Sequence, residues 1–231
     1  MTLARRGRLL LAPSILTADF ARLGDEIASV AEIVDWFHLD VMDGHYVANL
    51  TFGPSTVAAV RRSCDVPLHV HLMITHPARY AAAFADAGAT RISFHPETTE
   101  RPDEVAGAVR AAGAGAGVAV HPDVDVEIAA PLLSQLDVLL MMTVRPGFGG
   151  QAFMPEVVPK IKRAREMVDA SSAAVDVEVD GGVNLSTVDV VVGAGADIIV
   201  AGSAVYDGVD APAAAARMRE RLDMLSHGEA S

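Results

Sequence analysis

Two histidines and two aspartates occupy positions that could build a metal-dependent acid/base site. His38 and Asp40 are two positions apart in the apolar run Trp36–Val41, His71 lies in a second such run, and Asp180 ends a third. Because side chains alternate faces along a strand, His38 and Asp40 would point the same way. A mixed set of imidazole nitrogens and carboxylate oxygens suits a borderline divalent cation such as Zn²⁺, Fe²⁺, Mn²⁺ or Co²⁺. These residue types do not choose among the four ions.

Three turns rich in small residues could bind an anion beside this site. They are the stretch Gly147–Gly150 and the pairs Gly181-Gly182 and Gly202-Ser203. Backbone N–H groups exposed in such turns bind phosphate, and the loops after the last two strands of an eight-stranded β/α barrel are its usual phosphate site. Lys160 and Lys162 are the only lysines in the sequence. A phosphate group would therefore be held by backbone N–H groups and helix N-termini.

The elements that must position these residues follow a regular alternation. Short apolar runs with strand character alternate with longer Ala-rich amphipathic segments of helical character. The expected strands are Leu9–Ser14, Trp36–Val41, Leu68–Met73, Arg91–His95, Gly117–His121, Val138–Val144, Val175–Asp180 and Asp197–Ala201. The expected helices are Phe20–Val34, Ser55–Ser63, Pro77–Ala87, Glu104–Ala112, Pro155–Ala170, Leu185–Val192 and Pro212–Leu225.

Eight β-then-α units in 231 residues predict an α/β protein with a closed, parallel, eight-stranded (β/α)₈ fold, the TIM barrel. We expect one domain over residues 1–231, with a short N-terminal arm at 1–8 and a flexible tail at 226–231. Val126–Leu133 is weakly patterned and is interrupted by Pro131.

The polar residues fall at the carboxyl ends of the expected strands, which is the face where such barrels place their active sites. A lone inward histidine is more often a hydrogen-bonded core residue, and an Asp before Gly is often only a turn former. Charged groups on three inward faces are harder to explain in that way, because burying an unpaired charge is costly. Met42, Met73 and Met142 are expected to wall the site, although packing alone would also explain them.

Composition narrows the class of protein. Hydrophobic residues make up 51% of the chain, which supports a large core and argues against extended disorder. The formal net charge of −12 argues against nucleic acid and anionic membranes as partners. One cysteine, Cys64, excludes an intrachain disulfide and fits a reducing compartment, so we expect a cytoplasmic protein.

Almost the whole chain, roughly Leu9 to Asp207, resembles the ribulose-phosphate 3-epimerase family. The matching segments keep the family's order and spacing. They are APSIL, HLDVMDGHYVANLTFGP, VHLMI, MTVRPGFGGQAFMPEVVPKI, VDGGVN and VAGSAVY.

The resemblance implies an isomerase, a carbohydrate epimerase that inverts C3 of D-ribulose 5-phosphate to give D-xylulose 5-phosphate through an enediolate. Such an enzyme would serve the pentose phosphate pathway and would also suit the Calvin cycle. The resemblance implies one divalent metal ion per subunit, and a homo-oligomer is common in the family. It assigns the metal to His38, Asp40, His71 and Asp180, with Asp40 and Asp180 also acting as the acid/base pair. The substrate contacts that it implies are Ser14, His71, Gly147, Phe148, Gly149, Gly150, Gly181, Gly182, Gly202 and Ser203.

Four positions depart from the family's usual pattern. Ala48 stands where proline is usual, Thr143 and Arg145 replace Ser and Asn, and His121 replaces Asn. These departures bear on loop motion and substrate fit rather than on the type of reaction. The roles of His121 and Arg145 stay open at this point.

Three other functions remain as alternatives. The HPE motif at His95–Glu97 and the MTV motif at Met142–Val144 also resemble the allulose-6-phosphate 3-epimerase branch, which performs the same proton transfer on a six-carbon ketose phosphate. The intact DGG and GSA motifs favour the five-carbon substrate. A non-catalytic phosphosugar-binding barrel and a metal-dependent aldolase are the other two.

Overall fold

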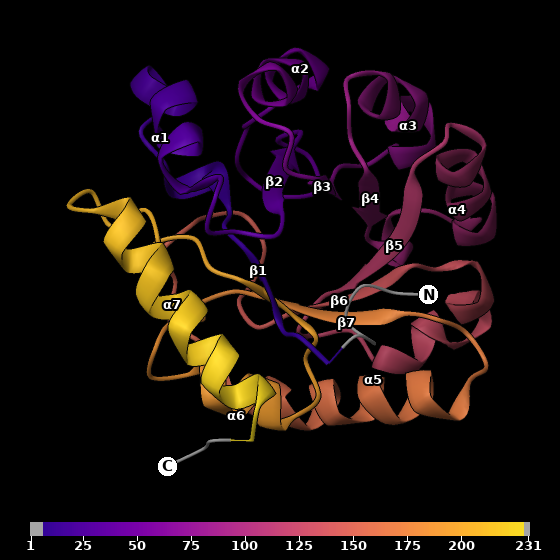
Figure 1. The fold of residues 1–231 in the computed structure, drawn as a ribbon. Coiled ribbons are helices and arrows are strands. Elements are labelled where there is room, and N and C mark those ends of the chain that lie inside the picture. Colours follow the sequence, from indigo (N-terminus) through magenta and orange to yellow (C-terminus); the bar gives the residue numbers. More distant parts are fainter. Residues whose placement is uncertain (1–6, 229–231) are drawn as a thin grey trace.

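Eight parallel strands form the centre of the computed structural model, which describes residues 7–228 (Figure 1). The strands are β1 (Leu10–Ala12), β2 (Phe37–Met42), β3 (Leu68–Met73), β4 (Arg91–Phe94), β5 (Gly115–Val120), β6 (Val138–Met142), β7 (Asp176–Asp180) and β8 (Ile198–Val200). Residues 1–6 of the expected arm and 229–231 of the expected tail lie outside the described residues.

The strands are hydrogen-bonded in the order β1-β8-β7-β6-β5-β4-β3-β2. The remaining gap between β1 and β2 is bridged just beyond β1. There Ser14 forms a parallel bridge with His38, and the His38 N–H donates to the Pro13 carbonyl at 2.9 Å. The prediction of a single eight-stranded TIM barrel is confirmed.

Within residues 7–228 the structure has seven α-helices, and they surround the strands (Figure 1). They are α1 (Leu23–Val30), α2 (Pro54–Ser63), α3 (Pro77–Asp86), α4 (Pro102–Ala111), α5 (Val158–Ala170), α6 (Val188–Gly193) and α7 (Ala211–Ser226). The connection between β5 and β6 is instead a 3₁₀ helix, Val126–Gln135. Pro131 lies inside it and cannot donate a backbone hydrogen bond, which agrees with the weak helical pattern of this segment.

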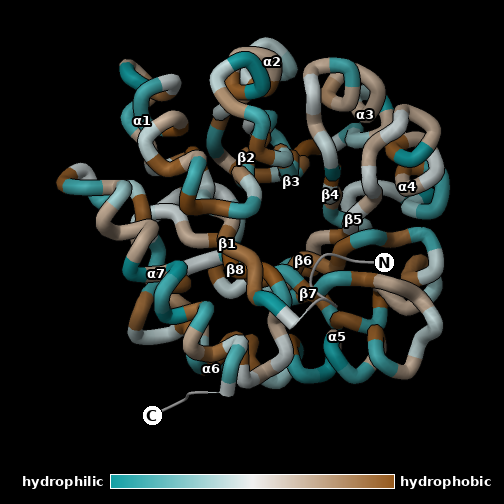
Figure 2. The backbone as a smooth tube through the Cα atoms, viewed as in Figure 1, coloured by the Kyte–Doolittle hydropathy of each residue, from teal (hydrophilic) through white to brown (hydrophobic). Residues whose placement is uncertain are grey.

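The main hydrophobic core lies between the strands and the helices. Outward-facing strand residues such as Leu39, Val70 and Val177 are fully buried there against apolar helix residues. Figure 2 shows β1 and β8 as largely hydrophobic, whereas the helices alternate hydrophilic and hydrophobic residues, as expected when one face of each is buried.

The inside of the barrel carries polar side chains at three levels. Nearest the amino ends of the strands, Arg91 pairs with Asp176 at 3.2 Å and covers the Trp36 ring at 4.6 Å. The strand register places His38 beside His69 in the middle level and Asp40 beside His71 in the upper level. The barrel therefore stacks its charged groups beneath its carboxyl-terminal mouth.

Candidate active site

The four predicted metal ligands lie together at the carboxyl-terminal end of the barrel. His38 Nε2 is 3.3 Å from Asp40 Oδ1 and 3.8 Å from Asp180 Oδ2, and His71 Nδ1 is 3.1 Å from Asp40 Oδ1. One ligand atom from each residue falls within 4.8 Å of the others. His38 Nε2 is buried and has no hydrogen-bond partner among the described residues. An orphaned imidazole nitrogen between two carboxylates fits a divalent cation, so the cluster could hold one.

A buried carboxylate fixes the orientation of His38. Glu178 Oε1 lies 3.0 Å from His38 Nδ1 and 2.9 Å from His69 Nδ1. An ionised carboxylate only accepts hydrogen bonds, so both imidazoles carry their proton on Nδ1. His69 Nε2 then accepts from the Ser93 hydroxyl at 2.7 Å, whereas His38 Nε2 points towards Asp40 and Asp180. Such outer partners commonly orient metal-ligating histidines.

The sequence motifs did not predict a role for Glu178 or His69. Strand alternation was the signal that could have found them, because Glu178 shares the inward face with Asp180, and His69 shares it with His71. A long-range register was also needed, since 140 residues separate Glu178 from His38.

The environments of the two aspartates push their pKa values apart. Burial by itself would raise the pKa of Asp40, but His38 and His71 lower it well below its usual range. Burial and then the nearby Asp40 carboxylate raise the pKa of Asp180 to about 7. One carboxyl group is therefore held ionised while the other is poised near neutrality, a pairing typical of acid/base sites.

The histidines respond differently to the same surroundings. Burial lowers the pKa of His71 to about 3, so its imidazole stays neutral, as a metal ligand must be. Burial would also lower the pKa of His38, but Asp40 and Glu178 raise it well above its usual range.

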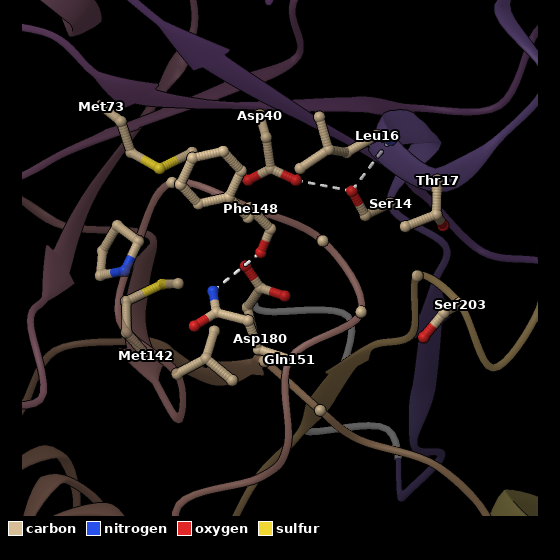
Figure 3. Close-up of a pocket in the computed structure, with 18 of the residues that line it drawn as sticks. Ser14, Leu16, Thr17, Asp40, Met73, Met142, Phe148, Gln151, Asp180 and Ser203 are labelled. Carbon is tan, nitrogen blue, oxygen red and sulfur yellow. Dashed lines mark hydrogen bonds between the residues drawn. The ribbon is translucent and has the colours of Figure 1, made fainter. Parts of the chain in front are cut away.

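A pocket opens directly above this cluster (Figure 3). Asp40 and Asp180 face it, and the Ser14 hydroxyl donates to Asp40 Oδ2 at 2.5 Å while accepting from the Leu16 N–H at 3.2 Å. The described residues lining it do not include His38 or His71, which are fully buried below. The predicted site residues that line it are Ser14, Asp40, Met42, Met73, Met142, Gly147, Phe148, Gly149, Gly150, Asp180, Gly181, Gly182, Gly202 and Ser203.

The Gly181-Gly182 turn has a backbone that only glycine adopts without strain. Its φ angles are +122° and +65°, and an added Cβ would lie 2.7 Å from the Val144 nitrogen or 2.4 Å from the Phe153 nitrogen. The Thr143 hydroxyl donates to the Gly181 carbonyl at 2.6 Å. Thr143 therefore supports this turn and does not itself line the pocket, among the residues that the structure describes.

The Phe148 side chain covers part of the pocket mouth and is 60% exposed. Two contacts hold the loop around it, since the Gln151 amide donates to the Phe148 carbonyl at 2.8 Å and the Asn49 amide donates to the Gly147 carbonyl at 2.8 Å. Gln151 and Asn49 therefore position this loop, although we did not select them from the sequence.

His121 and Arg145 act in the neighbouring loops. His121 Nδ1 accepts from the Asp123 N–H at 3.1 Å, and the Arg145 guanidinium pairs with the Asp123 carboxylate at 3.1 Å. Neither residue lines the pocket in the described part of the chain. His121 and Arg145 therefore stabilise the loops beside the pocket through Asp123.

Residues 10–206 match the model of the ribulose-phosphate 3 epimerase family. The chain belongs to this family. It is 49% identical over 217 residues to the ribulose-phosphate 3-epimerase of Mycobacterium leprae, a match that covers 94% of this chain and 96% of that one. The ribulose-phosphate 3-epimerase of Escherichia coli is 42% identical, with 94% and 98% covered.

Solved structures with the same fold include proteins that are far less similar in sequence. A 3-hexulose-6-phosphate synthase superposes with a TM-score of 0.70 at 21% identity, covering 92% of this chain and 99% of that one. A KGPDC from Streptococcus mutans in complex with D-R5P gives 0.74 at 17% identity, covering 93% and 97%. These two likenesses support the fold alone.

Membership of the epimerase family confirms the predicted enzyme class, an isomerase of the carbohydrate epimerase type. Among the helices that the structure describes, none is long and apolar enough to cross a membrane.

Proposed function

We propose that this epimerase interconverts D-ribulose 5-phosphate and D-xylulose 5-phosphate by metal-dependent inversion at C3. One observation carries the proposal: two carboxyl groups of opposite protonation tendency share a cluster with two imidazoles beneath a pocket rimmed by glycine turns. A non-catalytic phosphosugar-binding barrel would not need these groups together. The names of the similar epimerases support the choice of a five-carbon substrate.

His38, Asp40, His71 and Asp180 would hold the cation. When bound, it would supply positive charge that stabilises an enediolate of the substrate. Glu178 keeps the His38 lone pair directed at this position. Ser14 holds Asp40 by donating a hydrogen bond to the carboxylate oxygen that is turned away from His38.

Asp40 and Asp180 would carry the proton. In the ribulose direction, Asp40 takes the proton from one face of C3, and Asp180 delivers a proton to the opposite face. One C–H bond breaks and another forms, so the configuration at C3 inverts with no net change in atoms. The roles reverse for xylulose 5-phosphate, because each carboxyl group then starts in the other protonation state.

The glycine turns would bind the phosphate group. Gly147–Gly150, Gly181-Gly182 and Gly202-Ser203 line the same pocket as the two aspartates. Neither Lys160 nor Lys162 lines it among the described residues. Backbone N–H groups are therefore the proposed anchor, as in other barrels that bind phosphate after strands seven and eight.

Exchange of the C3 proton with D₂O tests this assignment. We expect Asp180→Asn to slow C3 exchange in D-xylulose 5-phosphate by about 10²–10⁴-fold, because Asp180 takes the proton in that direction and a positioned acid/base group contributes that much. Ligand binding, measured by calorimetry, should be largely retained. Asp65→Asn is the matched control, because the Asp65 side chain is fully exposed and lies away from the pocket.

Two results would count against the proposal. Undiminished exchange in Asp180→Asn would remove Asp180 from the chemistry. A higher kcat/KM for D-allulose 6-phosphate than for D-ribulose 5-phosphate would move the substrate to the six-carbon class. Product analysis by NMR would reveal C–C cleavage if the enzyme were an aldolase.

A further inference from the structure

The second metal-binding histidine also has an outer partner, and that partner is another histidine. His71 Nε2 lies 2.9 Å from His95 Nε2, and both residues are fully buried. β2, β3 and β4 are adjacent strands, and His95 directly follows β4. His95 contacts the Nε2 side of the His71 ring, whereas Asp40 contacts the Nδ1 side. His71 thus lies between Asp40 at its Nδ1 and His95 at its Nε2.

Beyond His95, the contacts continue to a carboxylate near the surface. His95 Nδ1 lies 3.3 Å from Glu97 Oε1, within ion-pair distance, and has no hydrogen-bond partner among the described residues. The Tyr46 hydroxyl donates to the same Glu97 oxygen at 2.8 Å, and the Tyr46 ring packs on His95 with 4.7 Å between centroids. The Glu97 side chain is 26% exposed, so the row of contacts runs from the site to solvent.

Two neutral imidazoles share one proton across the Nε2–Nε2 contact, which allows two arrangements. In the first, His71 carries the proton on Nε2, leaving Nδ1 free for a metal, and His95 carries its proton on Nδ1. The His95 Nδ1–H then lies beside the Glu97 carboxylate, whose negative charge favours a proton on that nitrogen. In the second, His71 carries its proton on Nδ1 and donates to Asp40, while the bare Nδ1 of His95 faces the Glu97 lone pairs.

The two carboxylates therefore favour opposite arrangements in the metal-free protein. Asp40 favours the second, because it accepts from His71 Nδ1 at 3.1 Å. Glu97 favours the first, because a carboxylate has no proton to offer a bare nitrogen. The first arrangement is the one that leaves a lone pair on His71 Nδ1 for a metal.

We propose that Glu97, acting through His95, is a positioning residue that selects the metal-competent tautomer of His71. This inference rests on the metal site of the proposed function. Glu97 would be the outer carboxylate of His71, as Glu178 is of His38. The difference is that Glu97 acts through the His95 imidazole, whereas Glu178 contacts His38 directly. Glu97 does not touch the ligand position itself, so it affects metal affinity rather than proton transfer.

The first test is metal affinity, measured with Zn²⁺ by chelator competition. We expect Glu97→Gln to weaken Zn²⁺ binding about 10–100-fold, the usual effect of losing an outer-shell partner. A Gln amide can donate as well as accept, so it no longer favours one tautomer. Glu100→Gln is the matched control, because Glu100 is exposed and three residues away in the same loop. With saturating metal, kcat of Glu97→Gln should approach that of the unaltered enzyme.

The second test reads the tautomers directly. In the Zn²⁺-loaded protein with ¹⁵N-labelled histidine, NMR should show His71 protonated on Nε2 and His95 on Nδ1. In metal-free Glu97→Gln, the fraction of His95 protonated on Nδ1 should fall below that of the metal-free unaltered protein.

Each result decides the inference. His95 protonated on Nε2 in the Zn²⁺-loaded protein would overturn it, as would unchanged Zn²⁺ affinity in Glu97→Gln. If the unaltered protein binds no divalent cation, both this inference and the metal site of the proposed function fail. If the unaltered protein binds Zn²⁺ tightly and Glu97→Gln binds it equally well, the inference about Glu97 alone fails.

Discussion

Replacing Asp180 by Asn should stabilise the metal-free protein while removing its function. Burial and the neighbouring Asp40 carboxylate raise the pKa of Asp180 from 3.8 to about 7. The His38 imidazole, with Nε2 3.8 Å from Asp180 Oδ2, lowers the pKa of Asp180 but does not offset burial and Asp40. The folded chain therefore carries an unfavourable charge at this position whenever Asp180 is ionised. An Asn side chain fills nearly the same volume without the charge.

The size of the effect follows from the shift in pKa. A rise from 3.8 to about 7 is roughly three units, and at about 1.4 kcal/mol per unit the cost of ionisation is on the order of 4 kcal/mol. The Asp180 side chain is 14% exposed, so water screens part of this cost. We expect Asp180→Asn to raise the free energy of unfolding of the metal-free protein by about 2–4 kcal/mol at pH 8.

The stabilisation by Asp180→Asn should be larger at high pH than at low pH. Because the folded-state pKa of Asp180 is raised, the folded protein favours protonated Asp180. The contribution of this protonated group to the free energy of unfolding is complete below the unfolded pKa of 3.8 and is lost as pH rises through about 7. The unaltered protein should therefore lose about 2–3 kcal/mol relative to Asp180→Asn between pH 5 and pH 8.

Urea unfolding in the presence of a chelator measures this directly, at pH 5 and at pH 8, with Asp65→Asn as the control. Added Zn²⁺ should reverse the order of stability, because metal binding stabilises only a folded state that retains the ligand. Two results would show that Asp180 is not an unfavourable buried charge. One is a lower free energy of unfolding for Asp180→Asn than for the unaltered protein at pH 8 without metal. The other is an equal stabilisation by Asp180→Asn at pH 5 and pH 8.

Two further substitutions test other parts of the site. Glu178→Gln should weaken Zn²⁺ affinity about 10–100-fold and lower the free energy of unfolding by about 1–3 kcal/mol, because two buried histidine N–H groups lose their carboxylate acceptor. Unchanged affinity in chelator competition would show that Glu178 does not orient His38. Gly182→Ala should lower the free energy of unfolding by at least about 1–3 kcal/mol, given its φ of +65° and an added Cβ 2.4 Å from the Phe153 nitrogen. Gly107 lies in the middle of α4 with open space around it, so Gly107→Ala is the control. It should be neutral or raise the free energy of unfolding by about 0.4–1 kcal/mol. If urea unfolding showed the same loss of stability in both glycine variants, the strain at Gly182 would not be the cause.

The sequence by itself determined the barrel and the location of its chemistry. β3 matches the expected range Leu68–Met73, and the other strands begin and end within two residues of prediction. Apolar runs and amphipathic segments are local patterns, and the alternation of side chains along each strand placed His38 with Asp40 on one inward face. The carboxyl ends of parallel strands meet at one edge, which gathered His71 and Asp180 beside them.

Only the tertiary structure decided what surrounds those four residues. Glu178 meets His38 across 140 residues of chain, and His95 meets His71 across 24, because the closed barrel brings side chains from different strands into contact. The pKa of Asp180 likewise depends on burial and on the nearby Asp40, quantities that arise once the barrel has closed. Local pattern therefore predicted which side chains enter the barrel, whereas packing between strands set the tautomer and charge of each one.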